Sequence, residues 1–215
     1  ILSQVTEALI YAAEKGVAHR DLHPANIFVS PDSKVIVSDF GMDMLRTAYK
    51  NAMKVDLSSS MAPYRAPEDT QGNPLDPYTD IYSLAVLSYE MLTGKLPFNG
   101  ISPSTVLVRQ LGSKPTEPTK LNSLLPSEVD QVLLRALDHR PRSRFDNPRE
   151  FFDLLKEALR SVPSDEIILP LPAEPLDDGA SIQTSKKRQS LSERHFNPNS
   201  DEEIYKYAQC ARKPT

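Results

Sequence analysis

The most apolar stretch of this 215-residue sequence, residues 81–92, places the strongest restriction on how the chain folds. It is shorter than the roughly 18 residues that a membrane-spanning helix needs, and Tyr82, Ser83, Ser88 and Glu90 interrupt it. A run of this length that is apolar around most of its circumference predicts a helix buried in a protein core. We therefore expect a fold that encloses this helix, with no membrane span within this chain.

The beginning of the sequence combines one helical pattern with several short β-type runs. Residues 1–15 carry apolar side chains at helical spacing, and Gly16 supplies the stop. The β-type runs are residues 17–18, 27–29 and 35–37. The Pro-Asp-Ser turn at residues 31–33 joins the last two runs, which predicts a β-hairpin.

Three later helices are indicated by their capping residues. Ser102 followed by Pro103 predicts a short helix that runs to Leu111. Ser127 and Asp130 form a predicted capping-box pair ahead of an apolar stripe. The last helix is opened by Asn147, Pro148 and Glu150. The apolar stripes of the last two helices are Val129, Val132, Leu133, Ala136 and Leu137, and Phe151, Leu154, Leu155, Ala158 and Leu159.

Composition divides the chain near residue 160. Residues 161–215 are rich in proline, serine and charge, include the basic run at residues 186–188, and lack the apolar periodicity of a core, which predicts a disordered tail or linker. Residues 41–61 show no periodicity, which predicts a long exposed loop. The expected folded domain is therefore residues 1–160, of the α+β class, mainly helical with short β-hairpins.

The residues best suited to chemistry form two neighbouring motifs. Residues 19–26 read HRDLHPAN between predicted strands, and Asp39-Phe40-Gly41 begins thirteen residues after Asn26. An Asp-x-x-x-x-Asn spacing alone is typical of a turn with local side-chain hydrogen bonds, and Asp-Phe-Gly alone is typical of a strand end. The two motifs together, in this order, are more specific than either alone.

With these motifs, the sequence resembles the protein kinase family, whose catalytic loop and magnesium motif have this order and spacing. Ala-Pro-Glu at residues 66–68 matches the end of the family's activation segment, residues 80–83 match the start of its central helix, and Arg144 matches the arginine partner of Glu68. The resemblance covers about residues 1–160 and is most similar to bacterial members. It implies the fold of the C-terminal kinase lobe.

The resemblance also implies ATP and Mg²⁺ as cofactors and Ser/Thr residues of proteins as substrates. Asp21 suits the acceptance of a substrate hydroxyl's proton, since phosphoryl transfer needs positioning and neutralised charge more than covalent help. Asn26 and Asp39 offer the oxygen ligands that magnesium prefers. The expected site is catalytic Asp21, His23 and Asn26, cofactor-binding Phe28 and Asp39, and metal-binding Asn26 and Asp39.

Other residues are expected to be structural. We expect Glu68 and Arg144 to form a buried ion pair, Asp80 to accept backbone N–H bonds from the catalytic loop, and His19 to be a packed core histidine. Arg20 is either a binding residue for a phosphate on the activation segment or a simple surface arginine. The candidate phosphate acceptors are Thr47, Ser58, Ser59 and Ser60.

Two departures lie within the resemblance. His23 stands where Ser/Thr kinases usually have lysine, and Met61 stands where they usually have the threonine that contacts it, although Ser60 fits that place after a one-residue shift. Neutral imidazole still donates a hydrogen bond, but it supplies no permanent charge. His23 is therefore expected either to take the lysine's role or to pack against Pro24 or point to solvent.

The family's glycine-rich phosphate loop, ATP-anchoring lysine and helix glutamate have no counterpart here, since no two of the seven glycines form Gly-x-Gly. We therefore expect that the N-terminal lobe is absent, that the chain, which begins at Ile1, is a fragment, and that it is inactive alone. The expected function is ATP-dependent phosphorylation of proteins. The alternatives are a pseudokinase that binds partners, and a small-molecule phosphotransferase, which the activation-segment landmark opposes.

Bulk composition limits the partners and the compartment. A formal net charge of −4 gives no basic surplus, so no nucleic-acid partner is expected. The single cysteine, Cys210, excludes an intrachain disulfide and favours a reducing compartment, and four histidines without ligand spacing make a zinc site improbable. We expect a cytoplasmic protein, or the cytoplasmic part of a larger one.

Overall fold

The computed structural model describes residues 1–42, 59–70 and 78–162 of the chain. The side chains at 59–61 and 70 are outside that description. The chain divides into two units, Ile1–Ala173 and Glu174–Thr215, of which the first holds every described residue. The predicted tail therefore lies almost wholly outside the described residues, as does most of the predicted loop at 41–61.

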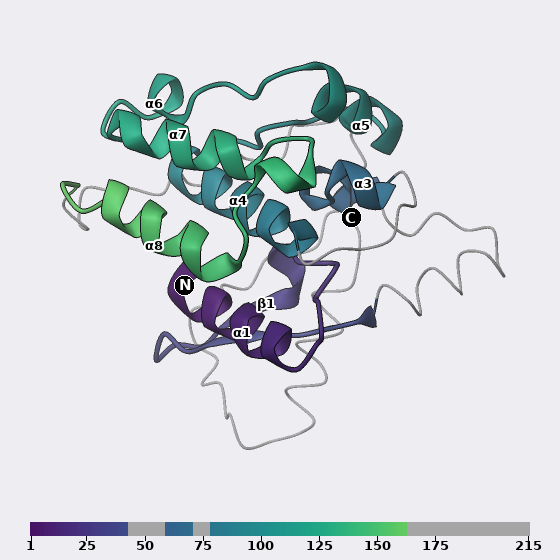
Figure 1. The fold of residues 1–215 in the computed structure, drawn as a ribbon, viewed down its shortest axis with the longest axis vertical. Coiled ribbons are helices and arrows are strands. Elements are labelled where there is room, and N and C mark those ends of the chain that lie inside the picture. Colours follow the sequence, from purple (N-terminus) through teal and green to yellow (C-terminus); the bar gives the residue numbers. More distant parts are fainter. Residues whose placement is uncertain (43–58, 71–77, 163–215) are drawn as a thin grey trace, which may run out of the picture. The chain divides into compact units, whose positions relative to one another are not determined.

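The described residues are mainly helical, with one small antiparallel sheet of two strands (Figure 1). The α-helices are α1 (Leu2–Glu14), α3 (Pro67–Thr70), α4 (Tyr78–Thr93), α5 (Pro103–Gly112), α6 (Pro118–Leu121), α7 (Ser127–Ala136) and α8 (Pro148–Ala158). The strands are β1 (Ile27–Val29) and β2 (Val35–Val37), and the 3-10 helices are η1 (Pro24–Asn26), η2 (Ser59–Tyr64) and η3 (Pro141–Ser143). No helix in these ranges is both long and apolar enough to cross a bilayer.

The central element is α4, which contains the apolar run at residues 81–92 and confirms its prediction as a buried helix. It packs against α1, α6, α7 and α8, and it lies between α1 and α7 in Figure 1. Its two buried serines are hydrogen-bonded: the Ser83 hydroxyl donates to the carbonyl of Tyr64 and the Ser88 hydroxyl to that of Leu84, both at 2.8 Å. A helix surrounded on all sides needs such bonds, because a buried hydroxyl without a partner is destabilising.

Helix α1 and the hairpin follow the sequence prediction closely. Gly16 has a φ of 71°, the left-handed conformation that glycine adopts without strain after a helix. Strands β1 and β2 pair with Phe28 opposite Ile36. The predicted strand at residues 17–18 was wrong: the two residues have no regular secondary structure and lead directly into the HRDLHPAN loop. The described part of the chain therefore contains one hairpin.

All three predicted helices form, and two of their three predicted caps are confirmed. The Ser102 side chain accepts the N–H of Thr105 at 3.2 Å, and that of Asn147 accepts the N–H of Glu150 at 2.9 Å. The predicted capping box of Ser127 and Asp130 was wrong. Pro126 is the N-cap of α7, without a side-chain cap bond. The Asp130 carboxylate instead accepts the backbone N–H and the hydroxyl of Thr119 at the start of α6.

A buried ion pair joins α3 to the segment before α8. Arg144 donates from Nη1 and Nη2 to the two carboxylate oxygens of Glu68, at 2.6 and 2.8 Å, as predicted. Its remaining donors reach the carbonyls of Asp138 and Tyr78 at 2.8 and 3.0 Å, and its guanidinium lies 4.8 Å from the ring centre of Tyr82. Four of the five N–H donors of the guanidinium are therefore hydrogen-bonded.

His19 is a core histidine, as predicted. Its side chain is fully buried, and its ring lies 4.5 Å from that of Phe40. Burial lowers the pKa of His19, because the charged imidazolium is poorly solvated there, and the nearby carboxylates of Asp80 and Asp21 offset part of the shift. The folded protein therefore holds a neutral imidazole at pH values where an exposed histidine gains a proton.

We predict that Glu68→Ala and Arg144→Ala each lower the free energy of unfolding by about 3–5 kcal/mol, the usual cost of a buried charge left without its partner. The double variant should cost less than the sum of the two single changes, because each removes the other's partner. Chemical denaturation of all four forms measures the difference.

The matched control is the exposed ion pair between Arg149 and Glu7, with an N–O distance of 3.3 Å. A double-mutant cycle on this surface pair should give a coupling energy of only about 0–1 kcal/mol. A Glu68–Arg144 coupling no larger than this would contradict the structural role of the buried pair.

We also predict that His19 makes the fold sensitive to mild acid. The unfolded chain binds a proton at His19 near pH 6.5, whereas the folded chain does so only at lower pH, so stability falls as the pH drops through this window. His19→Gln should reduce the loss of unfolding free energy between about pH 7.5 and 5.5, a range that brackets the ordinary histidine pKa.

The control for this experiment is His139→Gln, since His139 lies at the surface with its side chain 48% exposed. That variant should keep the wild-type change of stability with pH. Identical pH dependence in the wild type and His19→Gln would show that the buried histidine does not carry the acid sensitivity.

Candidate functional site

The HRDLHPAN loop is held in place by a buried aspartate of α4. Asp80 lies in the first turn of that helix, and its two carboxylate oxygens accept the N–H groups of His19 and Arg20 at 2.7 and 2.8 Å, as predicted. Burial raises the pKa of the Asp80 carboxyl, and the two N–H donors oppose this shift by stabilising the charged form. These two hydrogen bonds help to hold the backbone of Arg20, directly before Asp21, in a strained conformation with a φ of 69°.

Asn26 ties together the two predicted motifs. Its side-chain Nδ2 donates to the carbonyl of Asp21 at 2.9 Å, and its own carbonyl accepts the N–H of Ser38 at 2.9 Å. Ser38 directly precedes Asp39. The loop that carries Asp21 and the strand end that carries Asp39 are therefore joined through one buried residue, by its side-chain amide on one side and its backbone carbonyl on the other, and Asn26 Oδ1 does not take part in either bond.

Asp39 adopts an unusual backbone conformation at the end of β2. Its φ is 67°, and Gly41 has a φ of 71°, so the chain reverses within three residues. A non-glycine residue in the left-handed region is uncommon and costs free energy, and such residues cluster at functional sites. The Asp39 side chain is exposed and accepts a hydrogen bond from the Ser38 hydroxyl at 3.3 Å. The reversal therefore presents a carboxylate at the surface.

Asp21 is a buried carboxylate with two basic side chains beside it. His23 Nε2 lies 3.6 Å from Oδ2, too far for a hydrogen bond, and Arg65 Nη2 lies 3.3 Å from Oδ1. His23 is only 4% exposed, so the alternative that it points to solvent was wrong. Asp21, His23 and Asn26 are all buried, and their catalytic roles stay predictions.

Arg65 is the site residue that sequence reasoning missed. It lies 44 positions after Asp21, directly before the Ala-Pro-Glu motif. The available signal was indirect: the loop lacks a permanent cation at position 23, and a basic residue elsewhere in the segment is a candidate to supply one.

The neighbouring Tyr64 hydroxyl donates to Glu90 at 2.6 Å, and burial raises the pKa of this tyrosine.

Phe28 lies on β1, outside the Asp21–Asn26 network. Its side chain is 55% exposed, and its cross-strand partner Ile36 is 63% exposed. The hairpin therefore presents an apolar face, although large exposed aromatic side chains are unfavourable in water. The cofactor-binding role of Phe28 stays a prediction.

The donor set fits a magnesium ion better than a transition metal. No group of three or more His, Cys, Asp and Glu side chains within the described ranges is arranged to hold an ion. Magnesium in phosphoryl-transfer sites needs few protein ligands, because phosphate and water oxygens complete its coordination. One amide oxygen from Asn26 and the exposed carboxylate of Asp39 match that pattern.

The phosphate-acceptor candidates cannot be placed at this site. Thr47 and Ser58 lie outside the described residues, and the side chains of Ser59, Ser60 and Met61 are not described. Arg20 itself is half-buried rather than a freely exposed surface arginine.

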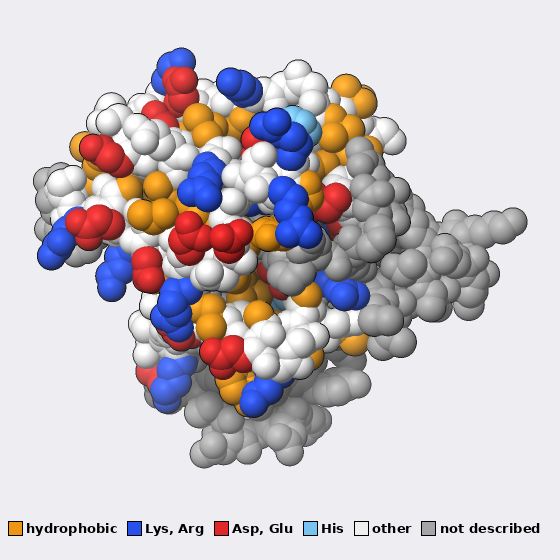
Figure 2. Space-filling model, in the orientation of Figure 1, with side chains coloured by type: hydrophobic (Ala, Val, Ile, Leu, Met, Phe, Trp, Pro, Cys, Tyr) orange, Lys and Arg blue, Asp and Glu red, His pale blue; other side chains and the backbone are white. Residues whose placement is uncertain are grey.

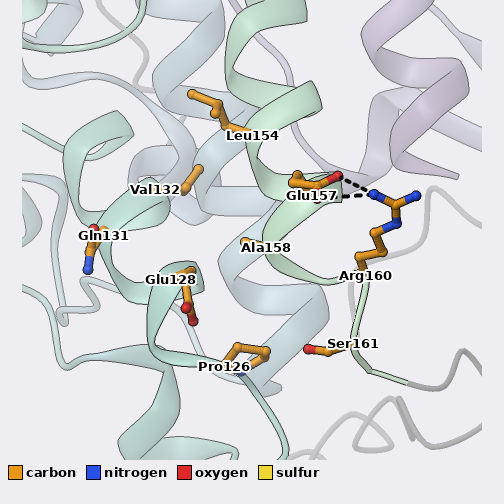
Figure 3. Close-up of a pocket in the computed structure, with 9 residues that line it drawn as sticks. All are labelled: Pro126, Glu128, Gln131, Val132, Leu154, Glu157, Ala158, Arg160 and Ser161. Carbon is orange, nitrogen blue, oxygen red and sulfur yellow. Dashed lines mark hydrogen bonds and ion pairs between the residues drawn. The ribbon is translucent and has the colours of Figure 1, made fainter.

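Two surface features lie apart from these motifs. A pocket of about 580 Å³ between α7 and α8 has an apolar floor formed by Val132, Leu154 and Ala158 (Figure 3). Its lining residues all come from positions 126–161, so it does not include the HRDLHPAN loop. On the described surface shown in Figure 2, acidic and basic side chains are interspersed.

Comparison with known proteins agrees with the motifs. A probable serine/threonine-protein kinase of Clostridium acetobutylicum is 31% identical over 167 residues, which cover 76% of this chain and 25% of that protein. Serine/threonine-protein kinase PknB of Mycobacterium tuberculosis is 33% identical over 153 residues, 70% of this chain and 24% of its own length. Pkn1 of Myxococcus xanthus, also named a serine/threonine-protein kinase, is 34% identical over 165 residues, 74% and 24% respectively.

The chain thus spans about a quarter of the length of these relatives. The protein kinase domain family matches residues 1–165, which is more than half of the sequence. With this match, and with the HRDLHPAN loop, the Asp39 motif and the Glu68–Arg144 pair in one fold, the chain belongs to the protein kinase family.

Proposed function

We propose that this chain forms the catalytic-loop part of a kinase that transfers the γ-phosphoryl group of ATP to Ser or Thr residues of proteins. The observation that carries the proposal is the Asn26 bridge, which bonds to the carbonyl of Asp21 and to the N–H of Ser38 beside Asp39. One buried residue, through its side chain and its backbone carbonyl, thereby links the segment of the proposed proton acceptor to the segment of the proposed oxygen ligands, and phosphoryl transfer depends on such positioning.

In this proposal Asp21 orients the substrate hydroxyl and receives its proton. The hydroxyl oxygen forms a bond to the γ-phosphorus, and the bond from that phosphorus to the bridging oxygen breaks, so that ADP leaves with the electron pair. Asn26 Oδ1 and the Asp39 carboxylate would hold Mg²⁺, which supplies positive charge to the phosphate oxygens. Phe28 offers the exposed apolar surface for the adenine ring.

We further propose that these 215 residues transfer phosphate poorly without additional sequence. They contain no Gly-x-Gly arrangement, and the resemblance assigns phosphate positioning to a loop of that kind. We therefore assign the kinase activity to a longer protein that includes these residues, and the activity is to be measured in that full-length protein.

A second candidate is a pseudokinase that binds partners without transferring phosphate. The observation that favours it is the engagement of Asp21 Oδ1 by Arg65 in a buried setting, together with the absence of lysine at position 23. The small-molecule phosphotransferase is less well supported, because the Glu68–Arg144 pair holds the segment that ends at the Ala-Pro-Glu motif.

The proposal predicts transfer of radiolabelled phosphate from ATP to a Ser/Thr substrate such as casein. Asp21→Asn should lower kcat by about 100-fold or more, because it removes the proton acceptor. Asp39→Asn should in addition weaken magnesium-dependent ATP binding, measured by titration calorimetry.

The matched control is Asp32→Asn in the hairpin turn, where the carboxylate is exposed and paired with Lys34. This variant should retain wild-type kcat. Wild-type protein that binds ATP and magnesium but transfers no phosphate would favour the pseudokinase, and an Asp21→Asn variant with unchanged kcat would refute the assigned role of Asp21.

A further inference from the structure

The guanidinium of Arg65 lies between two carboxylates. Nη2 is 3.3 Å from Asp21 Oδ1, and Nη1 is 3.7 Å from Asp69 Oδ2. The Arg65 side chain is 18% exposed, and those of Asp21 and Asp69 are 1% and 8% exposed. Water and salt screen charges weakly in such a setting, so a permanent cation here acts strongly on the Asp21 carboxylate.

The backbone around Arg65 is fixed from several directions. Its carbonyl accepts a hydrogen bond from the buried side chain of Gln110 on α5 at 2.9 Å, and its N–H donates to the carbonyl of Ala62 at 3.2 Å. Three residues later Glu68 is bound by Arg144. The backbone of Arg65 is therefore fixed by hydrogen bonds before its side chain contacts Asp21. This reduces the conformational entropy lost when the contact forms.

His23 does not duplicate this contact. It faces the other oxygen of Asp21, at 3.6 Å, and it is charged only when protonated. Arg65 donates a charge-assisted hydrogen bond to Oδ1 at 3.3 Å. The two basic side chains thus approach the carboxylate at different oxygens and with different charge.

We propose that Arg65 is a positioning residue for Asp21, and that Asp69 in turn orients the Arg65 guanidinium. Arg65 holds Oδ1 and so directs Oδ2 toward the substrate hydroxyl. The inference rests on the proposed kinase function. It assigns to Arg65, directly before the Ala-Pro-Glu motif, the positive charge that the HRDLHPAN loop lacks at position 23.

The test measures kcat and KM for ATP and for a protein substrate in the full-length protein with Arg65 replaced. Arg65→Met should lower kcat by about 10- to 100-fold, the cost of a misplaced reacting group, with KM for ATP little changed. Arg65→Lys should give an intermediate kcat, because one ammonium keeps the charge but cannot span both carboxylates. Asp69→Asn should lower kcat less than Arg65→Met.

The matched control is Arg149→Met, which breaks an ion pair of the same 3.3 Å length at the surface and should leave kcat at the wild-type value. Circular dichroism melting of each variant measures folding. If Arg65→Met fails to fold, Arg65→Lys decides the matter: an intermediate kcat supports the proposal, and a wild-type kcat overturns it.

Three other results would also overturn the positioning role. These are a wild-type kcat in folded Arg65→Met, a change confined to KM for the protein substrate, and an equal loss in the Arg149→Met control. They leave the proposed function intact, whereas a wild-type protein that transfers no phosphate would overturn the proposed function and this inference together.

Discussion

The contact on which the site depends most is that of Asp80 with the catalytic loop. A single carboxylate at the start of the central helix accepts two backbone N–H groups, from residues that lie 61 and 60 positions earlier in the chain. A partial positive charge at a helix N-terminus favours an anion there. Because other helices pack around α4, the hydrogen bonds of Asp80 attach the loop to a rigid part of the core. The same bonds hold Arg20 in its strained backbone conformation.

Much of this arrangement was predictable from the sequence where the pattern is local. The apolar run at residues 81–92 predicted α4, the turn at 31–33 predicted the hairpin, and Ser102 and Asn147 predicted two helix starts. The contacts of Asp80 and the Glu68–Arg144 pair were also predicted, although they are long-range. In those cases the order of the family motifs supplied the pairing that local patterns cannot.

Two of the differences between prediction and structure, those at Asp130 and Arg65, share one physical cause, which is a partner distant in sequence. Asp130 has the spacing of a capping box, but Thr119 offers its carboxylate a backbone N–H and a hydroxyl together. Residues 17–18 have strand composition, but they pair with neither strand of the described hairpin. Arg65 carries no local signal at all, since its contact with Asp21 depends on how the segment before α3 folds back on the loop. Side-chain competition of this kind becomes visible only in three dimensions.

The Glu68–Arg144 pair also affects the order in which parts of the chain fold during synthesis on the ribosome. Its two residues are 76 positions apart, so at a synthesis rate of about 5–20 residues per second Glu68 exists for roughly 4–15 s before Arg144 is made. During that interval the carboxylate has to remain hydrated, since burial without its partner is costly. We therefore expect α3 to dock only after η3 has emerged, which makes the segment beside the catalytic loop one of the last parts of the nascent domain to become ordered.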